Sequence, residues 1–220
     1  MVLRETKRNG NRAPWIAAFV LVLLASLLGM WTAGDNVTTL DVRVLDWIQR
    51  WHGDIPAALQ RSGDMLGDTY TAIGVVVVGI AIAALVRAWR IAVFLVFVGL
   101  LRVIGMGLKP IFESPRPITP EVRQRIYEMS EGFGYPSGHS MTAAMIATLA
   151  VVIAWNATRD TSIRLAVLVL ALGYAGLVGW SCIWVGAHWP TDVLGGWSFG
   201  VALVLIAWAF TRPLTGSDTR

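Results

Sequence analysis

Long apolar stretches recur along this chain, and they constrain its fold more than any other feature of the sequence. A helix needs about 20 mostly apolar residues to cross the hydrocarbon core of a bilayer. Six stretches reach or approach this length, at residues 14–33, 70–86, 91–108, 140–157, 165–183 and 193–211. With 55% hydrophobic and only 15% charged residues, the chain is too apolar for a soluble domain of 220 residues. The sequence therefore predicts an all-α membrane protein, a single domain over 1–220 in which six transmembrane helices form a bundle.

The first apolar stretch follows a basic tail, as the core of a secretory signal peptide does. Residues 13–34 contain no charged side chain, which makes an uninterrupted run of 22 residues. Signal-peptide cores are shorter, at about 7–15 residues. We therefore expect this stretch to be a retained transmembrane helix.

The distribution of basic residues predicts which way the bundle faces. Six spans put both termini on one side, and Lys and Arg are enriched on the cytoplasmic side of membrane proteins. The side with the termini would carry ten basic residues, against seven on the other side. The ten are Arg4, Lys7, Arg8, Arg12, Arg87, Arg90, Arg159, Arg164, Arg212 and Arg220. The prediction is a multi-pass protein of the cytoplasmic (inner) membrane with both termini in the cytoplasm.

The segment over residues 35–69, on the predicted outer side, has its own helical pattern. Apolar side chains recur at helical spacing, and charged side chains lie off that stripe. The apolar positions are Val42, Leu45, Ile48 and Trp51, and the charged ones are Asp41, Arg43, Asp46 and Arg50. The pattern predicts an amphipathic helix in the outer membrane interface. A helix packed over the end of the bundle would show the same pattern, and the two interpretations are compatible.

Three polar motifs lie beside the predicted spans. Residues 109–117 hold a Lys, six residues and Arg-Pro; residues 136–139 read Pro-Ser-Gly-His; residues 181–192 contain a His four residues before an Asp. The first follows the third span, the second precedes the fourth, and the third precedes the sixth. All three therefore fall at outer ends of helices, and we expect them to meet in one site although they are far apart in the sequence.

The first two motifs have the chemistry of a phosphate site. Lys109 and Arg116 can neutralise phosphate oxygens, Arg116 in bidentate fashion. Ser137 is a suitable N-cap for the fourth span, and Gly138 exposes a backbone amide at the positive end of that helix. His139 follows at once and can act as a general acid.

The third motif has the pattern of an activated histidine. Pro190 suits the first turn of the last span, with His188 just before that turn and Asp192 within it. The carboxylate can accept one imidazole N–H, which fixes the tautomer and leaves the other nitrogen free to attack. This is the orienting logic of a catalytic triad with histidine itself as the nucleophile.

Each motif also has an ordinary structural interpretation. A lone histidine at a helix end is more often structural than catalytic, cations at span ends commonly anchor a helix in the interface, and Ser-Gly is a common helix start. The convergence of all three motifs on one side of the membrane favours a shared phosphate site over three unrelated features.

Together the motifs resemble those of the type 2 phosphatidic acid phosphatases, which share their site with the vanadium haloperoxidases. The family pattern is Lys-x6-Arg-Pro, then Pro-Ser-Gly-His, then Ser-Arg-x5-His-x3-Asp, and the six-span layout covers nearly the whole chain. The resemblance implies a metal-independent phosphatase without a cofactor that works through a phosphohistidine. It assigns His188 as nucleophile, Asp192 as its partner and His139 as the acid. Lys109, Arg116, Ser137 and Gly138 would hold the phosphate.

One position departs from the family pattern. Cys182 follows Ser181 where the pattern has an arginine that contributes to the phosphate clamp. Loss of one such donor costs on the order of 10² to 10³ in rate at comparable anion sites. Arg102, seven residues before Lys109 on the same helix face, is a candidate replacement, although a structural pair or an interfacial anchor also explains an arginine there. Arg123 and Arg125 are further candidates, in an outer segment over 118–135 that is either a lid over the substrate head group or a solvated loop.

The sequence thus predicts an integral membrane lipid phosphatase with its site on the outer face. Undecaprenyl diphosphate, phosphatidylglycerol phosphate and phosphatidic acid fit such a site, and the small size and orientation favour the polyprenyl diphosphate. Cys182 keeps a non-catalytic lipid-phosphate binding protein open, and transfer to an acceptor other than water is a further alternative. A transporter fits less well because the polar groups gather at one face. The net charge of +4 does not indicate a nucleic-acid partner because the basic residues lie at span ends, and a single cysteine excludes an internal disulfide.

Overall fold

The computed structural model describes residues 2–34, 36–50, 54–117 and 132–215. The described part of the chain is helical throughout its regular elements. The long helices are α1 (Val2–Thr32), α4 (Thr69–Leu85), α5 (Trp89–Met106), α7 (Gly138–Ala157), α8 (Thr161–Trp184) and α9 (Pro190–Thr215). The shorter helices are α2 (Thr39–Gln49), α3 (Asp54–Gly67) and α6 (Lys109–Phe112).

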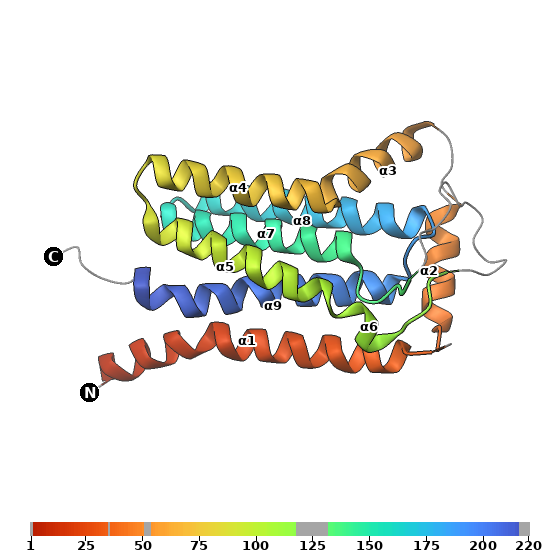
Figure 1. Ribbon diagram of the computed structural model, residues 1–220, viewed down its shortest axis with the longest axis horizontal. Coiled ribbons are helices and arrows are strands. Elements are labelled where there is room, and N and C mark those ends of the chain that lie inside the picture. The colour runs from red at the N-terminus through yellow and green to blue at the C-terminus, as the bar shows by residue number, and fades with distance from the viewer. Residues whose placement is uncertain (1, 35, 51–53, 118–131, 216–220) are drawn as a thin grey trace.

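The long helices run side by side as one bundle, and its two ends differ (Figure 1). The start of α1 and the end of α9 lie at one end, while α2 and α6 lie at the opposite end. Helix α9 is the central element, since it packs against α1, α5 and α7, and α7 in turn packs against α8. The starts of α7 and α9 and the ends of α5 and α8 therefore all lie at the end of the bundle away from the termini.

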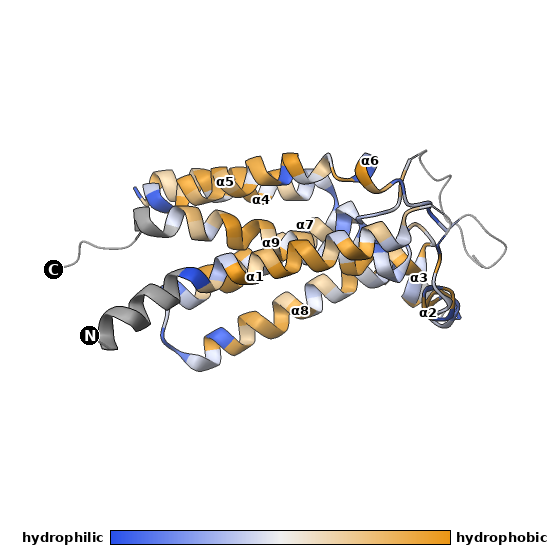
Figure 2. Cartoon of the chain, turned by 90° about the horizontal axis from the view of Figure 1, so that it is seen from below, coloured by the Kyte–Doolittle hydropathy of each residue, from blue (hydrophilic) through white to orange (hydrophobic). Residues whose placement is uncertain are grey.

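The bundle is built to sit in lipid. Within the described residues, five helices are long and apolar enough to cross a membrane, and the bent pair α3–α4 supplies a sixth span if it is counted as one. These helices consist mostly of apolar residues, as the hydropathy colouring shows (Figure 2), and large apolar side chains are exposed on several of them. Phe19 on α1 and Leu170 on α8 are 68% and 72% exposed. Exposed apolar side chains on this scale are favourable in hydrocarbon and unfavourable in water, so the chain is a multi-pass membrane protein.

The second predicted span differs in detail from the structure. Helix α4 has only 17 residues, and it joins α3 at a bend of 51°. Asp68 makes this break because its carboxylate accepts the backbone N–H of Tyr70 at 3.1 Å and so caps α4. The apolar pattern showed the second half of this unit and missed the first half, since α3 is much less apolar than the other spans.

The outer segment forms two helices where the sequence pattern predicted one. Leu45 and Ile48 are buried as expected, whereas Trp51 lies outside the described residues. Asp41, expected on the polar face, is only 1% exposed, which corrects that expectation. Its carboxylate closes a capping box with Thr38 and also accepts the backbone N–H of Thr191 at 2.9 Å. Helix α2 is therefore packed over the bundle and tied to the start of α9.

Close contact between α7 and α9 aligns the helix starts at the site. A Cβ atom on Gly196 would lie 2.6 Å from the carbonyl oxygen of Ser137, and one on Gly200 would lie 2.5 Å from that of Met141. Only glycine leaves room for backbones this close. The apolar core on either side of this contact includes Met141, Tyr135 and Phe199.

Candidate active site

A cavity of about 430 Å³ opens at the end of the bundle away from the termini. Its wall combines cationic, imidazole, carboxylate and backbone groups from separate helices. The polar and ionisable side chains that line it are Asp64, Thr69, Arg102, Lys109, Arg116, His139, Cys182 and His188, and Gly138 adds its backbone. The three predicted motifs therefore do converge, as the topology argument expected.

The first motif carries its two cations on a short, stiff turn. Lys109 begins α6, and the helix ends at Phe112 because the next residue, Glu113, has a left-handed φ of 48°. The Lys109 ammonium donates to the carbonyl oxygen of Phe133 at 3.2 Å. The Arg116 guanidinium donates to the carbonyls of Gly132 at 3.2 Å and Ala187 at 3.1 Å. Backbone carbonyls thus hold both cations at the cavity wall.

The second motif forms the start of α7. The Ser137 hydroxyl accepts the backbone N–H of Ser140 at 3.4 Å, which makes Ser137 the N-cap that the sequence predicted. Gly138 is the first residue of the helix and lines the cavity. The first backbone N–H groups of a helix lack partners within the helix, and the helix dipole favours an anion there. The cavity therefore receives the positive end of a 20-residue helix.

The third motif pairs an imidazole with a carboxylate in a buried place. His188 lies in the connection between α8 and α9, and its Nδ1 is 3.3 Å from Oδ2 of Asp192. Asp192 is fully buried, and the same oxygen accepts the backbone N–H of Trp189 at 2.9 Å. The pair has the geometry in which Nδ1 donates its proton to Asp192, so that Nε2 keeps its lone pair.

The electrostatics of His188 favour the neutral imidazole. Burial lowers its pKa well below the ordinary value of 6.5, and the positive charges of Lys109 and Arg116 lower it further. A histidine that stays unprotonated at neutral pH retains its nucleophilic nitrogen.

The cavity also contains a residue that sequence reasoning missed. Asp64, on α3, has its Oδ1 3.4 Å from Nε2 of His139, and both side chains are partly exposed to the cavity. One signal was available in the sequence: Gly63 and Gly67 lie one helical turn apart, which is typical of a face in close contact with another helix, and Asp64 is beside it.

Ser181 and Cys182, which the third motif made possible site residues, are placed differently from each other. The Ser181 hydroxyl donates to the carbonyl of Val178 at 2.8 Å, back along its own helix, and does not line the cavity. Cys182 does line it and is 6% exposed, with its sulfur 3.9 Å from the Ser137 hydroxyl. Cys182 and Ser137 therefore meet between α8 and the start of α7, where Cys182 lines the cavity and the fully buried Ser137 side chain does not.

Arg102 reaches the cavity from α5. Its Nε donates to the Thr142 hydroxyl at 3.1 Å, and its Nη2 lies 3.5 Å from the carbonyl oxygen of Gly138. The guanidinium thus lies beside the first turns of α7. Arg123 and Arg125, the other candidate cations, lie outside the described residues.

The donor set of the cavity suits an anion. Among the residues that the structure describes, no group of three or more His, Cys, Asp and Glu side chains is arranged to hold a metal ion. Three cationic side chains and a helix N-terminus instead surround one space beside two imidazoles. This is the arrangement expected for binding a phosphate group and transferring it to a nucleophile.

Comparison with curated proteins identifies relatives with related activities. The chain is 31% identical to phosphatidylglycerophosphatase B of Bacillus subtilis over 141 aligned residues. This alignment covers 64% of this chain and 67% of that protein. It is 37% identical over 96 residues to phosphatidylglycerophosphatase B of Escherichia coli K12, or 44% of this chain and 33% of that protein. It is 30% identical over 118 residues to human sphingosine-1-phosphate phosphatase 2, or 52% of this chain and 29% of that protein.

Two solved structures share the fold. The first transmembrane PAP2 type phosphatidylglycerolphosphate phosphatase from Bacillus subtilis superposes with a TM-score of 0.75 at 24% identity, over 90% of this chain and 96% of that one. LpxE from Aquifex aeolicus superposes with a TM-score of 0.60 at 20% identity, over 77% and 95% of the two chains. At these identities the structures support the bundle architecture rather than a substrate.

The family resemblance that the three motifs indicated is confirmed by a match to the family itself. The model of the PAP2 superfamily matches residues 87–215, which include all three motifs. The chain belongs to the PAP2 superfamily and is a membrane enzyme of the phosphoric ester hydrolase class.

Proposed function

We propose that this protein removes a phosphate group from a membrane lipid through a phosphohistidine on His188. The observation that carries the proposal is the buried His188–Asp192 pair, at 3.3 Å, on a cavity that also holds Lys109, Arg116 and the start of α7. A neutral imidazole held in one tautomer beside a cationic anion site is suited to nucleophilic attack on phosphorus.

The proposed reaction has two halves. In the first, Nε2 of His188 attacks phosphorus, the bond to the lipid oxygen breaks, and His139 gives that oxygen a proton. Asp192 stabilises the positive charge that develops on the His188 ring. In the second, His139 takes a proton from water, and the resulting hydroxide displaces phosphate from His188. Lys109, Arg116 and the first amides of α7 stabilise the charge on the phosphoryl oxygens in both halves.

Arg102 is proposed as the third cation of the phosphate clamp. Its guanidinium lies beside Gly138, on the cavity wall that also includes Cys182. An arginine has five N–H donors, and the contacts with Thr142 and Gly138 use two of its nitrogens. A donor from α5 would then compensate for the absence of an arginine at position 182.

The substrate is proposed to be a lipid phosphate, with phosphatidylglycerol phosphate as the first candidate. Curated relatives of the chain are phosphatidylglycerophosphatases, which is why this lipid precedes undecaprenyl diphosphate and phosphatidic acid. Gly105, Met106 and Met141 add an apolar portion to the cavity wall beside the cations. Such a wall suits a phosphate attached to a hydrocarbon chain better than a free polar metabolite.

The site is proposed to face the outside of the cytoplasmic membrane. The excess of basic residues on the side of the termini supports this orientation, and the cavity lies at the opposite end of the bundle. A reporter fused at the C-terminus tests it: an alkaline phosphatase fusion should be inactive and a green fluorescent protein fusion should be fluorescent. The reverse result would place the site in the cytoplasm.

Phosphate release by the purified protein in detergent, with EDTA present, tests the activity. We expect phosphatidylglycerol phosphate to be hydrolysed faster than undecaprenyl diphosphate or phosphatidic acid, and His188→Ala to abolish release while the protein stays folded. A different ranking of the three lipids would change the proposed substrate and leave the proposed mechanism unaffected.

Equal background release from wild type and His188→Ala would overturn the enzymatic proposal. Retained binding of the lipid in that case would support the non-catalytic role that Cys182 left open. Recovery of the phosphoryl group on an added alcohol would support the transferase alternative.

A further inference from the structure

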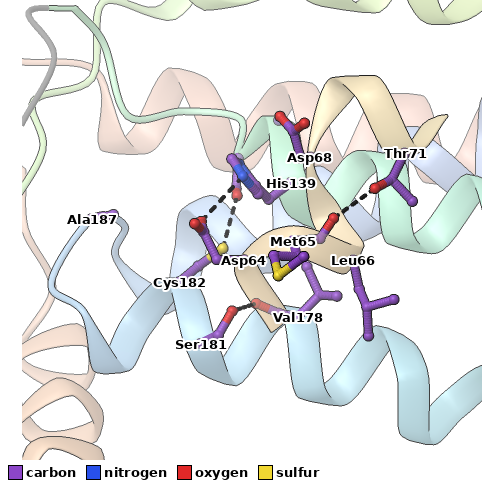
Figure 3. A network of polar contacts seen from close by, with 12 residues as sticks. Asp64, Met65, Leu66, Asp68, Thr71, His139, Val178, Ser181, Cys182 and Ala187 are labelled. Carbon is purple, nitrogen blue, oxygen red and sulfur yellow. Dashed lines mark hydrogen bonds and ion pairs between the residues drawn. The ribbon is translucent and has the colours of Figure 1, made fainter. Parts of the chain in front are cut away.

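The contact between α3 and the start of α7 carries an inference that rests on the proposed function. We infer that Asp64 is a positioning residue for the general acid: its carboxylate holds the imidazole of His139 so that one ring N–H is directed at the leaving oxygen. The observation is the 3.4 Å approach of Asp64 Oδ1 to His139 Nε2, on the wall of the phosphate cavity (Figure 3).

Helix α3 is pressed against the helices that carry the site. A Cβ atom on Gly67 would lie 3.0 Å from Cβ of His139, and one on Gly63 would lie 2.6 Å from Cβ of Ser181. Asp64 stands between these two glycines in the sequence and reaches His139 from the same turn. The absence of side chains at positions 63 and 67 therefore brings the Asp64 carboxylate within reach of the imidazole.

The end of α3 is held in place from two other helices. The Thr71 hydroxyl, on α4, donates to the carbonyl oxygen of Met65 at 2.6 Å (Figure 3). The Tyr174 hydroxyl, on α8, donates to that of Leu66 at 2.7 Å. These bonds satisfy carbonyls at the end of α3 that have no partner within the helix. Asp64 directly precedes Met65 and therefore lies on a turn whose backbone is fixed, as a positioning residue requires.

The charges around His139 explain why an acid at this place needs a carboxylate partner. The cavity holds the cations Arg102, Lys109 and Arg116, which repel a protonated imidazole. The Asp64 carboxylate opposes that repulsion at short range. The negative charge of the substrate phosphate also offsets these cations, but it is lost when phosphate leaves after each turnover, whereas the Asp64 side chain remains. The pair therefore gives the His139 imidazole a fixed carboxylate partner between turnovers.

The proton that the leaving lipid oxygen receives comes from His139, and Asp64 neither gains nor loses one. The imidazolium of His139 keeps one N–H toward Asp64 and gives the proton of the other nitrogen to the lipid oxygen. As that N–H bond breaks, an O–H bond forms, the P–O bond breaks and the bond from His188 to phosphorus forms. His139, now neutral, recovers a proton from the attacking water in the second half. Asp64 exchanges no proton in either half and touches no reacting atom.

Three variants test this role with the lipid substrate. We expect Asp64→Asn to lower kcat about 10- to 100-fold with KM within about twofold, because the effect lies in proton transfer rather than in phosphate binding. Asp64→Glu should recover part of the loss. The double variant Asp64→Asn/His139→Ala should be no slower than His139→Ala, because Asp64 acts only through His139.

A comparison of leaving groups separates positioning from a structural role. The leaving group of 4-nitrophenyl phosphate departs without a proton, whereas the alcohol of octyl phosphate needs one. The loss caused by Asp64→Asn should therefore be large on octyl phosphate and below about threefold on 4-nitrophenyl phosphate. Equal losses on both substrates, or a slower double variant, would overturn the inference and indicate that Asp64 only supports the fold.

A spectroscopic measurement tests the pair independently of turnover. The chain has three histidines, so their ¹⁵N imidazole signals can be assigned with single-histidine variants. In Asp64→Asn the Nε2 signal of His139 should move, because its partner changes from a carboxylate to an amide, while the His188 signals should stay. An unchanged His139 signal would refute the pair even if the wild type releases no phosphate, in which case the proposed function fails separately.

Discussion

The backbone N–H of Ser137 donates a hydrogen bond to the carbonyl oxygen of Asp192 at 3.0 Å. This bond joins the N-cap of α7 to the first turn of α9, so the phosphate-binding helix end and the nucleophile's partner cannot shift independently. Gly134 adds a second constraint, because a Cβ atom there would lie 2.7 Å from Oδ2 of Asp192. Backbone contacts between the starts of α7 and α9 thus hold the site together, and they fix where the side chains of both helix starts lie.

The role of Asp192 predicts a large effect of a nearly isosteric change. Asp192→Asn keeps the volume but offers an amide to Nδ1 of His188, which allows the wrong tautomer and removes the charge that stabilises the imidazolium. We expect kcat for phosphate release to fall by about 10² to 10⁴ with the fold retained. Circular dichroism and the size-exclusion profile control for folding. A loss below about tenfold would show that His188 does not depend on this carboxylate.

If Arg102 supplies the clamp donor that is absent at position 182, an arginine at either position should support activity. Removal of a phosphate-clamp donor in Arg102→Met should lower kcat/KM by about 10² to 10³. Cys182→Arg should then restore part of the activity in the Arg102→Met background, because an arginine from α8 can reach the same cavity. In the wild-type background Cys182→Arg should change activity by less than about threefold.

Steady-state kinetics of wild type, Arg102→Met, Cys182→Arg and the double variant test whether Arg102 replaces the missing arginine. Cys182→Ser is the size-matched control. A strong gain from Cys182→Arg alone would mean that Arg102 does not fill the place of the missing cation. Full activity of Arg102→Met would mean that its contacts with Thr142 and Gly138 serve only the packing of α5 against α7.

The close approach of α9 to α7 predicts that a single methyl group disturbs the site. In Gly196→Ala the new Cβ would meet the Ser137 carbonyl oxygen at 2.6 Å, so the helices must separate. We expect a loss of about 1–3 kcal/mol in stability and a clear fall in kcat. Gly173→Ala is the matched control, since a Cβ there meets nothing within 4 Å. Thermal unfolding in detergent should distinguish the two variants, and equal melting temperatures would contradict the tight contact.

The buried imidazole of His188 predicts a dependence of stability on pH. Burial and the neighbouring cations hold its folded-state pKa well below 6.5, so near and below that pH the unfolded chain binds more protons at this position. Its contribution therefore favours the folded state fully above about pH 6.5 and is lost as the pH falls toward the folded-state pKa. Thermal unfolding between pH 8 and pH 5 should show a smaller decline in His188→Gln than in wild type. Parallel curves would mean that His188 does not carry this dependence.

Much of the architecture could be predicted because bilayer thickness imposes a length and a composition on each span. Apolar runs revealed α5, α7, α8 and α9 to within a few residues of their observed ends. The end of α1 was also found, but this helix begins at Val2, well before the predicted start at residue 14, because its first turns are polar. The pair α3–α4 was only half visible, since a bent unit that turns part of its surface to a polar cavity loses the apolar signal. Asp41 was assigned to the wrong face because local periodicity does not register a partner on α9.

The sequence by itself determined that this chain is a helical membrane protein and that its three polar motifs end on one side, because span length and the alternation of sides are local and additive properties. Only the tertiary structure decided which polar groups face one another. Asp64 reaches His139 and Arg102 reaches Gly138 because glycine contacts and helix caps set the distance and rotation of neighbouring helices. Such distances depend on side chains from several helices at once, and no periodicity within one helix encodes them.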